Sequence, residues 1–200
     1  MRRSHLPEQL RVRIRKHYDY LWVHEKFQSL SLIADARLSR PLRREIGICL
    51  YGSAVLGVPF LNTTDIEILG EICLKLRLDV YLAKDIIFRE GELGRAMYVV
   101  KEGCVEVLAE GHQWLKPGDA TLKGRRARKR VTLVNSLAAP ERRAAEVMVE
   151  LRRNDYFGEL AIVSGGGGGG RRHHSTRAGT VCELLRLSKA DFGALSALPM

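Results

Sequence analysis

The first third of the chain repeats apolar positions with the spacing of a helix. Apolar residues recur there three or four positions apart, with basic residues between them, at Leu10, Ile14, Tyr18 and Leu21. This spacing predicts a helix over residues 6–28, with Pro7 in its first turn. The same periodicity returns from residue 30 to about residue 58, and a second helix is predicted to begin near Pro41. The pattern favours a helical subdomain that supports the rest of the chain, and the alternative is a helical collar that packs against neighbouring subunits.

The period changes after about residue 77. A helix-start signal at 62–65 precedes apolar positions that predict a helix to about Arg77. Short β-type runs with turn residues between them follow at 79–82, 86–88, 97–100, 105–108, 146–151 and 180–187. Ser188 then has the spacing of a helix cap with Asp191. Strands at roughly ten-residue intervals predict an antiparallel roll or barrel. The expected fold class is α+β, in which helices precede an antiparallel, jelly-roll-like β-roll with flanking helices.

Two stretches interrupt this pattern. Residues 122–130 hold six basic residues in nine, inside a segment over 119–145 without sustained periodicity. We interpret 119–145 as an inserted, mostly disordered loop; the alternative is a patch that binds anionic lipid or nucleic acid or directs nuclear import. Residues 165–170 are six glycines. No Gly-Lys-Ser/Thr follows them, so we interpret them as added loop length and not as a P-loop.

Composition limits the class of protein. The chain has 200 residues, of which 46% are hydrophobic and 28% charged, and a net charge of +10 that favours an acidic partner. No apolar run reaches the length of a transmembrane helix, and the basic N-terminus lacks the apolar centre of a signal peptide. The four cysteines are widely spaced, which favours buried thiols in a reducing compartment over a zinc site or disulfides. We expect a soluble cytosolic segment.

Residues 156–163, together with Arg171 and Arg172, carry the most specific chemistry in the sequence. An aromatic pair precedes Gly158, Glu159 and a short apolar segment that predicts one helical turn. A glycine allows a ligand to approach the backbone, and the first amides of a helical turn can donate to an anion. The two arginines suit a phosphate, and Glu159 suits a sugar hydroxyl. Phosphate, sugar and an apolar wall together indicate a nucleotide.

These residues resemble a known family. Residues 157–161, the arginine pair and 175–178 resemble the phosphate-binding cassette of cyclic-nucleotide-binding domains, and 86–98 resembles a turn and strand of that domain. Upstream, 6–10, 18–22 and 41–46 resemble the helical C-linker of cyclic-nucleotide-gated ion channels. The resemblance implies a C-linker over 1–58 and a cyclic-nucleotide-binding domain over 59–200, which includes both interruptions.

The resemblance also assigns roles to residues. It places Arg172 on the phosphate, Glu159 on the ribose 2′-hydroxyl, and the amides of Gly158 and Ala161 near the phosphate. The full candidate set for ligand binding is Gly158, Glu159, Leu160, Ala161, Arg171, Arg172, His173, Val107, Val149 and Leu151. The last three would form the apolar wall behind the base, and the alternative for them is ordinary core. His173 stands where the family usually has threonine, and the histidine pair is not expected to bind metal.

The implied function is that of the cytosolic regulatory region of a cyclic-nucleotide-regulated cation channel. It would bind cAMP or cGMP, without a further cofactor, and couple binding to gating through the C-linker. The expected partners are a pore elsewhere in the same chain, three further subunits in a tetramer, and anionic lipid at the basic insertion; nucleic acid and enzymatic activity are not expected. The family's final helix, which closes over the base, has no counterpart before Met200, so weak binding is expected. The alternatives are a non-binding assembly domain and a cyclic-nucleotide-responsive transcription regulator.

Overall fold

The computed structural model describes residues 6–23, 32–33, 35–62, 65–109, 146–163 and 170–196. The predicted basic insertion at 119–145 lies outside these residues, and so does the glycine run apart from Gly170.

The helices begin and end close to the predicted positions. They are α1 (Glu8–Val23), α3 (Arg40–Leu56), α4 (Ile66–Lys75), the short α5 (Leu160–Val163) and α6 (Lys189–Ser196). The predicted N-terminal helix is confirmed to residue 23, and its last five residues lie outside the described part. Pro41 lies in the first turn of α3, as expected. The predicted cap of α6 is also confirmed, because the amide of Asp191 donates to Ser188 Oγ at 3.1 Å.

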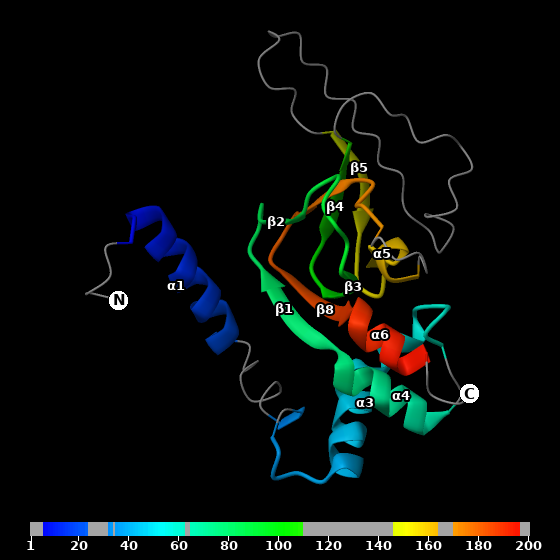
Figure 1. Ribbon diagram of the computed structural model, residues 1–200. Helices are drawn as coiled ribbons and strands as arrows, with labels where there is room; N and C mark the ends of the chain where they lie inside the picture. Colours follow the sequence, from blue (N-terminus) through cyan, green and yellow to red (C-terminus); the bar gives the residue numbers. More distant parts are fainter. Residues whose placement is uncertain are drawn as a thin grey trace, which may run out of the picture.

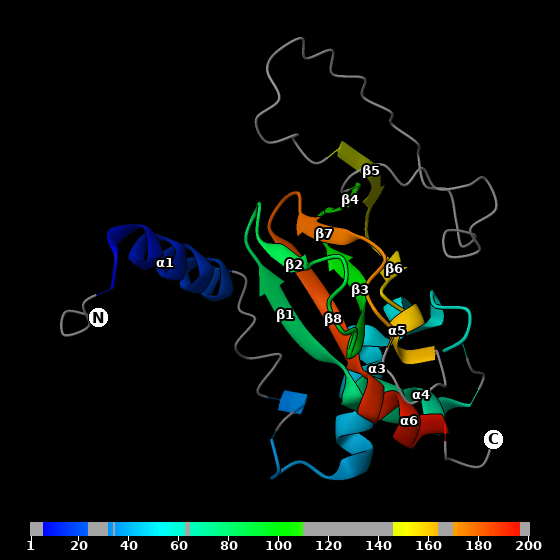
Figure 2. The ribbon, with the colours of Figure 1, turned by 45° about the horizontal axis from the view of Figure 1, so that its top comes forward.

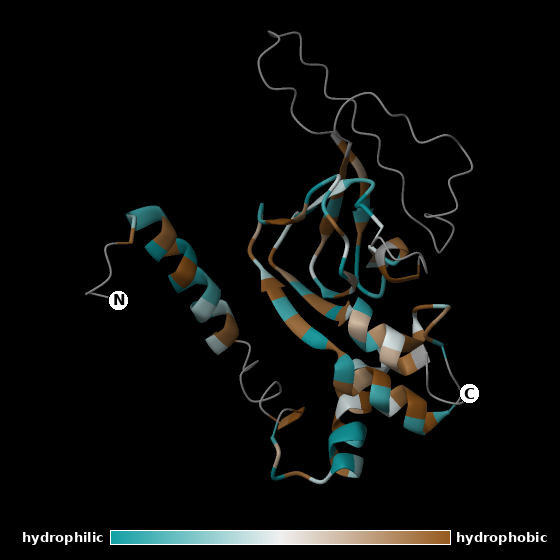
Figure 3. Ribbon diagram, in the orientation of Figure 1, coloured by the Kyte–Doolittle hydropathy of each residue, from teal (hydrophilic) through white to brown (hydrophobic). Residues whose placement is uncertain are grey.

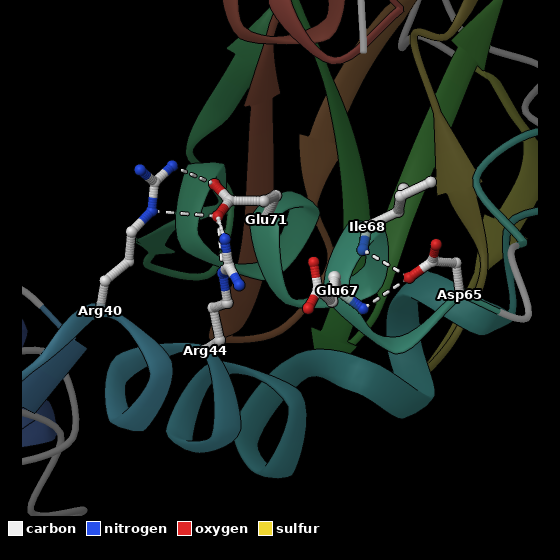
Figure 4. A network of polar contacts seen from close by, with 6 residues as sticks. All are labelled: Arg40, Arg44, Asp65, Glu67, Ile68 and Glu71. Carbon is white, nitrogen blue, oxygen red and sulfur yellow. Dashed lines mark hydrogen bonds and ion pairs between the residues drawn. The ribbon is translucent and has the colours of Figure 1, made fainter. Parts of the chain in front are cut away.

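Side chains fix the start of α4 and its contact with α3 (Figure 4). The carboxylate of Asp65 accepts from the amides of Glu67 and Ile68, which satisfies two donors that the first helical turn leaves unpaired. On the same helix, Glu71 accepts from Arg40 Nη2 at 2.9 Å and from Arg44 Nε at 2.6 Å. The hydrogen bond from Arg40 is the main cause that lowers the pKa of Glu71. These ion pairs hold α4 against α3.

Two four-stranded antiparallel sheets form the rest of the fold (Figures 1 and 2). The first sheet has the order β1-β8-β3-β6, and the second has the order β2-β7-β4-β5. The strands are β1 (Arg77–Tyr81), β2 (Ile86–Phe88), β3 (Ala96–Glu102), β4 (Val105–Ala109), β5 (Glu146–Leu151), β6 (Tyr156–Phe157), β7 (Ser175–Ala178) and β8 (Cys182–Ser188). The predicted α+β class with an antiparallel β-roll is confirmed.

The first sheet buries side chains on both faces. Met97 and Val99 of β3 belong to a cluster with residues of α3 and α4, which we call the helical cluster. Ala96, Tyr98 and Val100 alternate with them and belong to a cluster shared with the second sheet, which we call the inter-sheet cluster. Alternation along a strand places successive side chains on opposite faces. The first sheet therefore separates the helices from the interior of the roll.

The helical cluster extends across residue 58. It includes Tyr51, Val55 and Val58 on one side of that position and Leu61 and Leu69 on the other. In both views, α3, α4 and α6 lie together at one end of the sheets (Figures 1 and 2). The division at residue 58 stays a prediction, and the helical cluster contains residues of both proposed units.

Of the cysteines, Cys73 and Cys182 are buried, whereas Cys49 is exposed, which departs from the expectation of buried thiols.

Helix α1 lies to one side of the sheets and contacts the roll through polar side chains. Tyr20 Oη donates to Glu183 Oε1 of β8 at 2.8 Å, and Arg13 Nη2 lies 2.7 Å from Asp85 Oδ1. Glu183 is completely buried, and Lys101 Nζ lies 3.4 Å from its other oxygen. Burial, followed by the hydrogen bond to Glu183, raises the pKa of Tyr20. A buried carboxylate therefore joins α1 to the first sheet.

The hydropathy of α1 varies along its length (Figure 3). Apolar and polar residues mix along it, and Tyr18, Trp22 and Val23 are exposed. Across the described residues, none of the helices has the length and apolar character needed to span a bilayer.

Candidate functional site

The candidate site is built on the segment between β6 and β7. We call its described residues, 156–163 and 170–178, the cassette. It begins with β6, turns at Gly158, continues as α5 and returns through Arg171 and Arg172 to β7. The single helical turn predicted after Glu159 is confirmed as α5.

Arg172 connects the cassette to the roll. The residue is 7% exposed, and its Nη1 and Nη2 donate to the carbonyl oxygens of Gly158 and Ala96 at 3.0 and 2.6 Å. Its amide donates to the Glu92 carbonyl, and its own carbonyl accepts from Gly91, each at 2.8 Å. The side chain therefore joins both arms of the cassette to β3.

The Arg172 guanidinium also rests on an aromatic group. Its central carbon lies 3.9 Å from the centroid of the Phe88 ring, a cation–π geometry. Phe88, Tyr98 and Phe157 pack together, with 5.3 Å between the stacked rings of Tyr98 and Phe157. All three aromatic residues are buried. Sequence analysis missed this role for Phe88, since an aromatic residue in a strand ordinarily indicates only core.

Two opposite charges are partly desolvated in the cassette. Burial lowers the pKa of Arg172, while the negative charges of Glu92 and Glu159 act in the opposite direction. Burial raises the pKa of the Glu159 carboxyl, which its own backbone amide and Arg172 partly offset. Desolvation disfavours both charged forms. A ligand that brings an anion to Arg172 and a neutral hydroxyl to Glu159 would compensate both groups.

The remaining candidates divide into buried and exposed groups. Val107 and Leu151 are buried and Val149 is half-buried, all in or against the inter-sheet cluster. Their position fits both an apolar wall and ordinary core. Arg171 is exposed, and its Nη1 donates to the Gly91 carbonyl at 2.7 Å.

The three remaining candidates are His173, Leu160 and Ala161. His173 is exposed and Leu160 is half-buried, while the side chain of Ala161 lies outside the described part. The structure therefore brings together Gly158, Glu159 and Arg172 as the polar part of the candidate site, whose role in binding stays a prediction.

Substituting Gly158 with alanine is expected to displace Arg172. Gly158 has a φ of +76°, and a Cβ there would overlap Arg172 Nη1. Gly91 is the matched control, because its φ is +80° but its Cβ would have no atom within 4 Å. Backbone strain costs about 1 kcal/mol or more in both variants. Melting curves should show the larger loss for Gly158→Ala, and equal losses would mean that Arg172 accommodates the methyl group freely.

The raised pKa of Glu159 predicts a pH-dependent stability. The Glu159 carboxyl binds its proton more tightly in the folded chain than in the unfolded chain. The contribution of Glu159 to the free energy of unfolding is therefore most favourable at low pH and declines as pH rises through the raised pKa. Glu159→Gln removes the charge. Its melting temperature should exceed that of the parent at pH 7 and approach it near about pH 4. Glu45→Gln, an exposed change on α3, is the control; an equal gain in that variant would show that burial of Glu159 is not the cause.

Comparison with known proteins extends these observations. No family model matches the chain. Over 196 residues, which are 98% of the chain, it is 29% identical to potassium/sodium hyperpolarization-activated cyclic nucleotide-gated channel 4 of Oryctolagus cuniculus. The identity to channel 3 of Homo sapiens, over the same length, is also 29%. It is 27% identical to channel 2 of Mus musculus over the same length. The chain spans 13%, 20% and 18% of these relatives, respectively. Nearly the whole chain is thus similar to one segment of hyperpolarization-activated cyclic nucleotide-gated channels, which confirms the resemblance to the cyclic-nucleotide-gated channel family that its motifs predicted.

Proposed function

We propose that this chain is the regulatory region of a cyclic-nucleotide-regulated cation channel and that it binds cAMP or cGMP in the cassette. The observation that carries the proposal is the buried positive charge of Arg172, fixed next to Gly158 and in the field of Glu159. A cyclic phosphate carries one negative charge and would pair with this arginine.

The cassette has donors and acceptors suited to the rest of the nucleotide. Within the described residues, the carbonyls of Ala96 and Gly158 accept from two of the N–H donors of the guanidinium, and the others would donate to phosphate oxygens. Glu159 would accept from the ribose 2′-hydroxyl. Val107, Val149 and Leu151 would pack against the base. The proposed role is binding and not catalysis.

The coupling proposed for this region runs from the cassette to the helices. Ile162 of α5 is 4% exposed and belongs to the helical cluster together with Tyr51 and Val55 of α3. A ligand that repositions α5 would therefore change packing around α3. Binding would favour one of two helical arrangements and bias a pore outside this chain.

The wider setting is proposed from similarity to the relatives. The chain would lie at the cytosolic face of a membrane, in a tetramer whose subunits contact each other through the helices. The basic segment at 119–145 would contact anionic lipid.

One observation favours a second function, an assembly domain that binds no nucleotide. The terminal nitrogens of Arg172 already donate to carbonyls within the chain, and His173 replaces the usual threonine. An arginine held in this way could serve the fold alone.

Calorimetric titration with cAMP, with cGMP and with 5′-AMP as a control separates the two functions. The proposal expects saturable binding of at least one cyclic nucleotide and weaker binding of 5′-AMP, whose open phosphate has a different charge and shape. Folded protein that binds neither cyclic nucleotide at millimolar concentration would contradict the proposal and support the assembly domain.

A further inference from the structure

One polar residue interrupts an apolar row on the interior face of the second sheet. Phe88 of β2 pairs with Thr176 of β7, Thr176 pairs with Val107 of β4, and Val107 pairs with Val149 of β5. Paired residues on neighbouring strands have side chains about 5 Å apart on the same face. Thr176 thus lies between the ring that supports Arg172 and the two valines of the proposed wall.

The Thr176 side chain lies on the interior face. Ala178, two residues further along β7, belongs to the inter-sheet cluster, whereas the intervening Arg177 pairs with Glu106 through a 2.8 Å hydrogen bond. Residues two apart on a strand share a face. Thr176 is 2% exposed, in agreement with this placement.

The hydroxyl of Thr176 makes no hydrogen bond within the described part of the chain. Burial of an unpaired hydroxyl is unfavourable, and buried polar groups ordinarily have a partner. The neighbouring Ser175 shows the ordinary case, because this residue is equally buried and its Oγ accepts from the amide of Glu90 at 3.0 Å. Valine would fill the position of Thr176 without an unpaired group, so the structure alone does not require threonine there.

We propose that Thr176 is a ligand-binding residue whose hydroxyl donates to an acceptor on the part of the nucleotide between the cyclic phosphate and the outer edge of the base. This inference rests on the proposed function and adds a contact outside the candidate set. The place of Thr176, between the Phe88–Arg172 pair and Val107, corresponds to the ribose and the adjoining ring atoms of the purine. Those atoms are common to cAMP and cGMP. Thr176 therefore contributes affinity for both nucleotides and does not choose between them.

Thr176→Val tests the proposal, because valine keeps the β-branched shape and removes only the hydroxyl. The expected result is an approximately fivefold weaker binding of both cAMP and cGMP, the effect of one neutral hydrogen bond. The melting temperature of the ligand-free variant should be unchanged or higher. Ser175→Ala is the matched control, and it should lower the melting temperature because it leaves the Glu90 amide unpaired.

Each outcome has a distinct meaning. Equal affinities of the parent and Thr176→Val for both nucleotides would overturn the inference and leave the proposed function intact. A loss for one nucleotide alone, or a lower melting temperature of Thr176→Val, would overturn it as well. Absence of binding by the parent chain would overturn the proposed function together with this contact. Titration with 7-deaza-cAMP, which lacks the purine N7, identifies the acceptor. If N7 accepts the hydrogen bond, Thr176→Val should not weaken binding of this analogue further. If another atom shared by both nucleotides accepts it, Thr176→Val should weaken binding of the analogue about fivefold.

Discussion

Arg172→Glu is expected to weaken binding of either cyclic nucleotide by about 100-fold or more. A charge-assisted hydrogen bond contributes about 1.5–3 kcal/mol, and each 1.4 kcal/mol is tenfold in affinity. The substitution removes this contribution and places a negative charge against the phosphate. It also leaves the carbonyls of Ala96 and Gly158 without their donor, and it adds a like charge near Glu159.

A companion variant separates binding from folding. Arg172→Lys keeps the positive charge but loses the planar arrangement of donors. We expect it to fold and to bind about tenfold more weakly. Arg15→Glu makes the same charge change as Arg172→Glu on an exposed position of α1, and it should leave affinity unchanged. Calorimetry and melting curves of all three variants provide the test, and full affinity in a folded Arg172 variant would overturn the assignment of this residue.

Lys101→Met is expected to destabilise the fold by about 3 kcal/mol, because it removes the cation that lies 3.4 Å from the buried carboxylate of Glu183. Tyr20 donates to one oxygen of Glu183, but a neutral hydroxyl does not offset the charge. For a chain of this size the loss corresponds to a decrease in melting temperature of roughly 5–10 °C.

Two further variants test the cause of this loss. Lys75 also faces a carboxylate, that of Asp191 at 3.5 Å, but its side chain is 42% exposed. Lys75→Met should therefore change stability by less than about 0.5 kcal/mol. Adding Glu183→Gln to Lys101→Met should recover most of the stability, since a neutral amide needs no counter-ion. A double variant as unstable as Lys101→Met alone would show that packing of the lysine stem is responsible.

Local signals in the sequence predicted most of the elements. Helical periodicity with Pro41 and the cap at Asp65 located α3 and α4, and β-type runs located six of the eight strands. The other two strands, β6 and β7, have two and four residues and lie inside the cassette. Strand β6 is too short for a period of two to be evident, and the first three residues of β7 are polar and give no apolar β-type run. Their pairing with β3 and with β2 and β4 identifies them as strands, and pairing depends on the whole fold.

The composition of the candidate site was predicted better than its geometry. The motif placed Gly158, Glu159 and Arg172 in one cassette, and the structure brings them together. It could not predict that Arg172 donates to carbonyls of the chain or rests on Phe88, because these contacts join residues 14 to 84 positions apart. The same limit applies to Tyr20 and Glu183, which are separated by 163 positions. Nor does the sequence distinguish Thr176 from a core threonine, since only the register places it between Phe88 and Val107.

The burial of Ile162 among the helices has an energetic consequence. One short turn carries both Leu160 and Ala161 of the candidate site and a side chain of the helical cluster. If a nucleotide shifts this turn, the free energy that couples the ligand to the helices is the same in either direction. A neighbouring subunit that contacts α3 would then change the affinity for nucleotide by a certain factor. The nucleotide would change the affinity of that subunit contact by the same factor. The dissociation constant of the isolated chain and that of the assembled protein would therefore differ, and their ratio would measure the work available for gating.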